Sequence, residues 1–240
     1  MLERMRPKAI LFDLYGTLLD IRTEEHELGP WNVLANFLRY RGSRASGGEL
    51  QQEYFRRVTE SLNGSSETHP DIDVVSVFRT MMEAHGVEST PELGEMVAQL
   101  FRSLTIRRFN LFPETEDVLR QLAARFRLGL VTDSQKPYVY PELKLLDLEK
   151  YFSVIVCSAH FGYRKPDPRL FEEALRRMEL REDEVVYVGD STDRDVTGAF
   201  NAGIAAVWIR RKGHHGATDI LPGVTELPDL RGLLAIGTQP

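Results

Sequence analysis

The chain has 240 residues, of which 42% are hydrophobic and 28% charged, and this suits one large globular domain or a core with an insert. Its net charge of −6, without a run of Lys or Arg, gives no electrostatic footprint for nucleic acid. The single cysteine, Cys157, excludes an intramolecular disulfide and a cysteine-based metal cluster. No secretory leader and no apolar run of membrane-spanning length are found, so we expect a cytoplasmic protein without a membrane partner. Monomer and homodimer are not separated by the sequence.

The first predicted element is a short apolar run, Ala9–Phe12, which is typical of a buried β-strand. Asp13 follows it directly, and a turn through Tyr15 and Gly16 comes next. Open α/β sheets bind ligands at the carboxyl ends of their strands, so Asp13 is a candidate reactive group. Taken alone, a solvated aspartate at a strand end explains the pattern equally well.

The following segment is predicted to be helical, and no strand is expected between residues 23 and 110. Apolar residues recur at helical spacing in four stretches, which begin near Trp31, Leu50, Val74 and Met96. The segments 46–49 and 89–92 each place a Ser three residues before a Glu, as in a capping box. We therefore predict a helical domain over residues 21–110, inserted into a core made of residues 1–20 and 111–240.

From Phe112 onward the pattern becomes alternating helix and strand. The predicted helices are Glu114–Phe126, Pro137–Leu146, Pro168–Met178 and Asp195–Ala202. The predicted strands are Leu128–Val131, Phe152–Cys157, Val185–Val188 and Ile204–Ile209. Such alternation predicts an α/β fold with a parallel sheet whose two faces are covered by helices. The stretch Val224–Leu234 is expected to fold back on this core.

Four motifs follow one another along the core: DLYGT (Asp13–Thr17), VTD (Val131–Asp133), RKPDP (Arg164–Pro168) and GDSTDRD (Gly189–Asp195). Each motif alone is weak, but the four in this order are specific. Together they resemble the haloacid dehalogenase (HAD) superfamily of hydrolases. The resemblance implies a Rossmann-like parallel sheet and makes the helical insert a cap, which would exclude water and select the substrate.

The resemblance also implies a role for each motif. Asp13 would be the nucleophile and form an aspartyl-enzyme intermediate. Mg²⁺ would be bound by Asp13, Asp190 and the backbone carbonyl of Tyr15, while Asp195 would bind it or orient a bound water. These carboxylates are the hard oxygen ligands that Mg²⁺ prefers, and the cation would offset repulsion between Asp13 and an anionic substrate.

The remaining predicted site residues would bind the substrate. Thr132 would donate a hydrogen bond to a phosphoryl oxygen, and Lys165 would neutralise charge that develops in the transition state. Thr17 and Asp133 are included among the substrate-binding residues. Asp133 stands where the family usually has Asn or another small polar residue, and an acid there either points away from the site or binds the cap.

Tyr15 departs from the pattern of the family's phosphatases. They carry a second Asp at this position, which protonates the leaving alcohol and later activates water. A tyrosine has an ordinary pKa near ~10 and is a poor general base at neutral pH. The family's L-2-haloacid dehalogenases carry Tyr here, and a halide needs no proton in order to leave.

Three functions are therefore compared. The leading one is a Mg²⁺-dependent phosphatase acting on a small phosphorylated metabolite, because Asp190 and Asp195 beside Asp13 would repel one another without a cation. The alternative is a metal-independent L-2-haloacid dehalogenase, which Tyr15 favours. Such dehalogenases hold the halide and carboxylate with a cap arginine, and no clear match is found among the candidates Arg39, Arg41, Arg44, Arg56 and Arg57. The third is a non-catalytic relative that binds a phosphorylated ligand.

Overall fold

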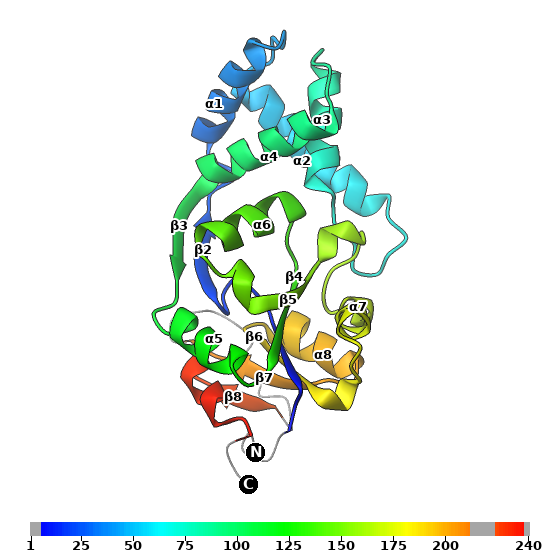
Figure 1. Ribbon diagram of the computed structural model, residues 1–240. Helices are drawn as coiled ribbons and strands as arrows, with labels where there is room; N and C mark the ends of the chain where they lie inside the picture. The colour runs from blue at the N-terminus through cyan, green and yellow to red at the C-terminus, as the bar shows by residue number, and fades with distance from the viewer. Residues whose placement is uncertain (1–5, 212–223, 238–240) are drawn as a thin grey trace.

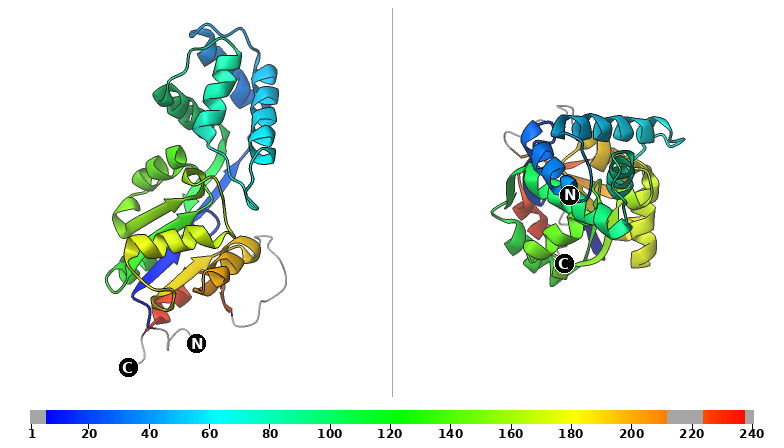
Figure 2. Two further views of the ribbon diagram at one scale, coloured as in Figure 1. Left: turned by 90° about the vertical axis from the view of Figure 1, so that its right-hand side faces the viewer. Right: turned by 90° about the horizontal axis from the view of Figure 1, so that it is seen from above.

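The computed structural model describes residues 6–211 and 224–237, and Figures 1 and 2 show a helical cap above an α/β core. The core contains a six-stranded parallel sheet in the order β5–β4–β1–β6–β7–β8. Its strands are β1 (Ala9–Phe12), β4 (Arg127–Thr132), β5 (Phe152–Cys157), β6 (Val185–Gly189), β7 (Ala205–Ile209) and β8 (Thr225–Leu227). The predicted α/β fold, with its parallel sheet and inserted helical segment, is confirmed.

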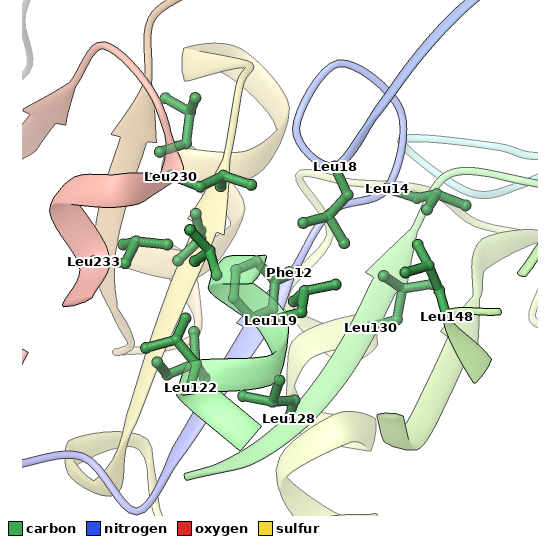
Figure 3. Packing of buried hydrophobic residues seen from close by; sticks show 14 of the residues in the cluster. Phe12, Leu14, Leu18, Leu119, Leu122, Leu128, Leu130, Leu148, Leu230 and Leu233 are labelled. Atoms are coloured by element: carbon green, nitrogen blue, oxygen red, sulfur yellow. The ribbon is translucent and has the colours of Figure 1, made fainter. Parts of the chain in front are cut away.

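Helices cover both faces of this sheet, which is why its central strands are continuous apolar runs rather than alternating ones. One face packs against α5 (Thr115–Ala123), part of α6 (Lys136–Leu145) and the C-terminal 3₁₀-helical segment Leu230–Ala235. Figure 3 shows Leu119 and Leu122 of α5 beside Phe12 and Leu128, with Leu233 of the C-terminal segment nearby. The other face packs against α7 (Pro168–Met178) and α8 (Thr197–Asn201). The prediction that the C-terminal stretch returns to the core is therefore confirmed.

The cap has a hydrophobic core of its own. Its four helices are α1 (Leu28–Arg39), α2 (Gly47–Asn63), α3 (Val74–Ala84) and α4 (Pro91–Thr105). Trp31, Tyr54, Phe78 and Phe101 pack together at its centre, with ring centroids 4.3 to 5.7 Å apart. The predicted capping box at Ser46 is present and begins α2. The second one is wrong, because α4 is capped by the Thr90 hydroxyl, one residue after the predicted serine.

A two-stranded antiparallel ribbon joins the cap to the core, and the sequence reasoning missed it. Its strands are β2 (Leu19–Thr23) and β3 (Ile106–Leu111), and Figure 1 shows them side by side between the two parts. The ribbon exposes charged side chains, such as Arg108, which pairs with Asp20 at 2.9 Å. The charged residues interrupt the apolar alternation by which a strand is recognised, and the prediction of no strand between residues 23 and 110 is wrong at β3. Among the described residues, no helix is long and apolar enough to cross a membrane.

Candidate active site

The register of the central strands gathers the first, second and fourth motifs at one edge of the sheet. Phe12 of β1 pairs with Leu130 of β4 and with Val188 of β6. In parallel strands the carboxyl ends lie at the same edge, so the polar residues that follow converge there. Asp13, Thr132 and Asp190 are the side chains brought together in this way.

Three carboxylates form a cluster at this edge. One oxygen from each of Asp13, Asp190 and Asp195 lies within 4.8 Å of the others, a spacing that one metal ion could bridge. Asp195 comes from a π-helical turn (Thr192–Val196) that precedes α8, where the sequence predicted one regular helix. The close approach requires glycine nearby, because a Cβ at Gly16 would lie 2.2 Å from Asp190 Oδ2.

Lys165 contacts two of the three carboxylates and is almost fully buried. Its ammonium group donates to Asp13 Oδ1 at 2.7 Å, to Asp195 Oδ1 at 2.5 Å and to the Tyr187 hydroxyl at 3.1 Å. Burial disfavours the ammonium form, but Asp13 and Asp195 outweigh this effect and raise the pKa of Lys165 above its usual range. The lysine of the third motif thus lies against the nucleophile candidate, as predicted.

The pKa values of two carboxylates of the cluster are raised, first by burial and then by the neighbouring negative charges. Burial raises the pKa of Asp13 to about 8; Lys165 opposes this rise, and Asp195 and Asp190 add to it. Burial and Asp195 likewise raise the pKa of Asp190. A cation bound among these oxygens would favour their charged forms and lower both pKa values.

Thr132 and Asp133 end the second strand of the site. The Thr132 hydroxyl is buried and has no hydrogen-bond partner among the described residues, so it is free to bind a ligand oxygen. Asp133 Oδ1 accepts from the backbone N–H of Lys165 at 2.9 Å, and so it holds the lysine loop rather than the cap. Its Oδ2 lies 3.9 Å from the guanidinium of Arg194, a cation that the sequence reasoning had not singled out.

Thr17 supports the cluster from the first loop. It is fully buried, and its hydroxyl donates to Asp190 Oδ1 at 3.4 Å. The backbone carbonyl of Thr17 accepts from Arg211 at 2.8 Å, which ties the loop to the end of β7. Thr17 therefore lies beside a predicted metal ligand, and its predicted contact with the substrate stays a prediction.

The Tyr15 hydroxyl is bound by residues outside the four motifs. It donates to Glu142 Oε2 at 2.6 Å and accepts from the Ser134 hydroxyl at 3.1 Å. The other Glu142 oxygen, Oε1, accepts from Arg102 Nε of the cap at 2.8 Å. Burial raises the pKa of Tyr15; Arg102 opposes this rise and Glu142 adds to it, so the phenol stays neutral.

The sequence reasoning missed Glu142 and Arg102 because they lie on α6 and α4, and no motif surrounds them. Ser134 precedes α6 but does not cap it, since Gln135 occupies the N-cap position and Ser134 contacts Tyr15. Four of the five candidate cap arginines contact other residues of the cap; they are Arg39, Arg41, Arg56 and Arg57.

A second contact between cap and core lies near the third motif. The cap loop between α2 and α3 forms an antiparallel bridge from Pro70 to Tyr163. Beside it, the Arg164 N–H donates to the His69 carbonyl at 2.8 Å. The cap loop therefore contacts the core residues that directly precede Lys165 in the sequence.

Comparison with known proteins agrees with this geometry. The family model of haloacid dehalogenase-like hydrolases matches residues 49–209. A glyceraldehyde 3-phosphate phosphatase from Methanopyrus kandleri is 30% identical over 211 residues, which cover 85% of this chain and 84% of the relative.

Two solved structures are similar in fold over nearly the whole chain. A HAD phosphatase from Thermococcus onnurineus is 26% identical with a TM-score of 0.60, covering 94% of this chain and 95% of that one. A 2-haloacid dehalogenase from Pseudomonas syringae pv. Tomato DC3000 is also 26% identical, with a TM-score of 0.68, covering 96% of this chain and 97% of that one. The family model spans more than half of the chain, and the four motifs meet at one site, so this protein belongs to the haloacid dehalogenase-like hydrolases.

Proposed function

We propose that this hydrolase is a Mg²⁺-dependent phosphatase that acts on a small phosphorylated metabolite, with Asp13 as its nucleophile. The observation that carries the proposal is the cluster of Asp13, Asp190 and Asp195, whose oxygens lie within 4.8 Å of one another around Lys165. The phosphatase from Methanopyrus kandleri, which is similar over most of its length, supports the same class of substrate.

The charges of the site fit one divalent cation. When all are ionised, the four carboxylates of the cluster and of Asp133 exceed the two cations, Lys165 and Arg194, by two negative charges. Burial and this excess raise the pKa values of Asp13, Asp190 and Asp133 while no further cation is bound. Asp13, Asp190 and the Tyr15 carbonyl would hold Mg²⁺, with Asp195 beside them. The ion would supply positive charge that screens Asp13 from an anionic phosphoryl group.

The residues of the chain then perform a two-step displacement. A carboxylate oxygen of Asp13 forms a bond to phosphorus while the ester P–O bond breaks, and its electron pair stays on the leaving oxygen, which takes a proton from water. A water molecule next attacks the phosphorus of the aspartyl phosphate, its proton goes to the hydroxide left by the first step, and the Asp13–phosphorus bond breaks to give inorganic phosphate. Lys165, which contacts Asp13, and the Thr132 hydroxyl, which is unpartnered among the described residues, would bind the oxygens on which charge accumulates.

Tyr15 implies a preference among phosphorylated substrates. Its only proton is donated to Glu142 rather than left for a leaving oxygen. An alkoxide would then depart with little help from this residue, so we expect esters of acidic alcohols or phenols to react fastest.

A metal-independent dehalogenase is the second candidate, favoured by Tyr15 and by the similarity to the dehalogenase from Pseudomonas syringae. That chemistry needs a cation for the substrate's carboxylate and for the departing halide. Arg102 is the cap arginine beside Tyr15, 5.2 Å from its ring, but the buried carboxylate of Glu142 already neutralises it. Two further acids beside Asp13 also oppose binding of an anion without a metal.

The test is hydrolysis of 4-nitrophenyl phosphate with Mg²⁺ and with a chelator. We expect turnover that the chelator abolishes and that Asp13→Asn eliminates. Asp183→Asn is the matched control, because Asp183 is an exposed aspartate whose ion pair is with the exposed Arg181, and it should leave the rate unchanged. Turnover in chelator, or none under either condition, would contradict the proposal, and halide release from 2-haloacids would then be measured.

A further inference from the structure

Glu142 joins three parts of the molecule that are distant in the sequence. It lies on α6 of the core and accepts one hydrogen bond from the nucleophile loop, through Tyr15, and one from cap helix α4, through Arg102. Ser134, which follows the second motif, donates to the same Tyr15 hydroxyl. Figure 1 shows α4 lying directly above α6, the arrangement that these contacts require. Tyr15, Ser134, Arg102 and Glu142 are called the Glu142 network below.

The charged members of the Glu142 network are largely buried and hydrogen-bonded to one another. The Glu142 side chain is 8% exposed and that of Arg102 13% exposed, so water can replace few of their contacts. Each Glu142 oxygen has one donor, and the Arg102 guanidinium also lies over the rings of Tyr15 and Tyr138, at 5.2 and 4.9 Å. Removing one member would leave a buried charge or hydroxyl without its partner, at a cost in free energy. This cost holds the members of the network in fixed relative positions.

We propose that Glu142 is a positioning residue, which fixes the Asp13 loop through Tyr15 and fixes the cap above it through Arg102. The role rests on the proposed phosphatase function, since it concerns the placement of that nucleophile. Tyr15 lies two residues after Asp13, so movement of its ring is transmitted to the attacking carboxylate through a short length of backbone. Misplacement of a reacting group by ~1 Å can cost roughly a hundredfold in rate.

This role differs from proton transfer by Tyr15. The Tyr15 hydroxyl donates its proton to Glu142 and accepts a hydrogen bond from Ser134. Its proton is therefore not available to a leaving oxygen in this arrangement. If Tyr15 acts only through Glu142, then its loss should slow every phosphate ester by the same factor. If Tyr15 protonates the leaving oxygen, then its removal should lower the rate more for esters with poor leaving groups than for esters with good ones.

The test is a double-mutant cycle of Tyr15→Phe and Glu142→Gln, measured as kcat and KM with Mg²⁺ on 4-nitrophenyl phosphate and on phenyl phosphate. We expect each single variant to lower kcat by roughly ten- to a hundredfold. The double variant should lose no more than the worse single one, because both changes break the same connection. Glu173→Gln is the control, since Glu173 is ion-paired with Arg176 and Arg177 on α7, away from the site, and should leave kcat unchanged.

Additive losses in the cycle, or a larger loss on phenyl phosphate than on 4-nitrophenyl phosphate, would overturn the positioning role. If Glu142→Gln does not fold, then Glu142→Asp, which keeps the charge and shortens the side chain by one methylene, replaces it in the same cycle with the same expectation. Absence of turnover by the unmodified protein would instead remove the proposed phosphatase function. The two failures are therefore distinguishable.

Discussion

Replacement of Lys165 by methionine tests the electrostatics of the site most directly. The lysine is the buried counter-ion of both Asp13 and Asp195, at 2.7 and 2.5 Å. Removing one partner of a buried ion pair typically costs ~3–5 kcal/mol, because the remaining charge stays in a low dielectric. Two carboxylates lose the same cation here, so we expect a loss of unfolding free energy near ~5 kcal/mol in chelator at pH 8.

The loss should depend on pH with a definite sign. Because the pKa of Asp13 in the folded protein is raised to about 8, the folded state binds more protons than the unfolded state between about pH 4 and pH 8. The stability that this proton contributes is present at low pH and is lost as the pH rises through this window. In Lys165→Met, a protonated Asp13 needs no counter-ion and costs less free energy to bury than a charged one. The loss of unfolding free energy should therefore be smaller at pH 5 than at pH 8.

The assay is urea unfolding followed by the fluorescence of Trp31 in the cap and Trp208 in the core, in chelator at both pH values. Lys150→Met is the matched control, since Lys150 is exposed and its contacts with Asp147 and the ring of Tyr151 lie at the surface, and a much smaller loss than in Lys165→Met is expected. A Lys165→Met protein as stable as the unmodified one at pH 8, or equally destabilised at pH 5, would refute the assignment of Lys165 as the counter-ion.

Three further substitutions test individual contacts. Thr132→Val removes a hydroxyl without a described partner, so the Tm should not fall, while inhibition by inorganic phosphate should weaken roughly tenfold; a lower Tm with unchanged inhibition would contradict this. Asp190→Asn removes one of three repelling charges, so the Tm in chelator should rise and the Tm shift caused by Mg²⁺ should disappear. Gly16→Ala adds a Cβ 2.2 Å from Asp190 at a φ of +84°, so denaturant unfolding should show a loss of ~1–2 kcal/mol and titration a weaker affinity for Mg²⁺.

The core of the site was predictable because its signals are local. Asp13, Thr132 and Asp190 each follow an apolar run, and a parallel sheet places the ends of such runs at one edge. The strand order makes these three residues neighbours, since β1 lies between β4 and β6. Recognition of the four motifs then needed no knowledge of side-chain contacts.

The Glu142 network could not be predicted in the same way. Tyr15 and Glu142 are separated by 127 residues, and Arg102 and Glu142 by 40, so no spacing along the chain relates them. On α6, Glu142 follows Pro141 in a helix whose sequence gives no reason to bury a carboxylate. The ribbon of β2 and β3 was missed for a related reason, because the partner of a charged residue such as Arg108 is Asp20 on the other strand, 88 residues away in the sequence.

In the sequence, Tyr15 favours a dehalogenase and Asp190 favours a phosphatase. The contacts of the two residues show that both can be part of one site. The proton of the phenol is donated to Glu142, whereas Asp190 lies with Asp13 and Asp195. A neutral phenol adds no charge to that cluster, whereas an aspartate at the same position would add one more negative charge to a site that already has an excess. The cation of the proposed phosphatase would therefore be bound because of Asp190 and Asp195, whatever residue stands at position 15. The absence of an acid at position 15 would instead favour substrates with good leaving groups, so the proposed function combines a metal site of the phosphatase type with a first motif of the dehalogenase type.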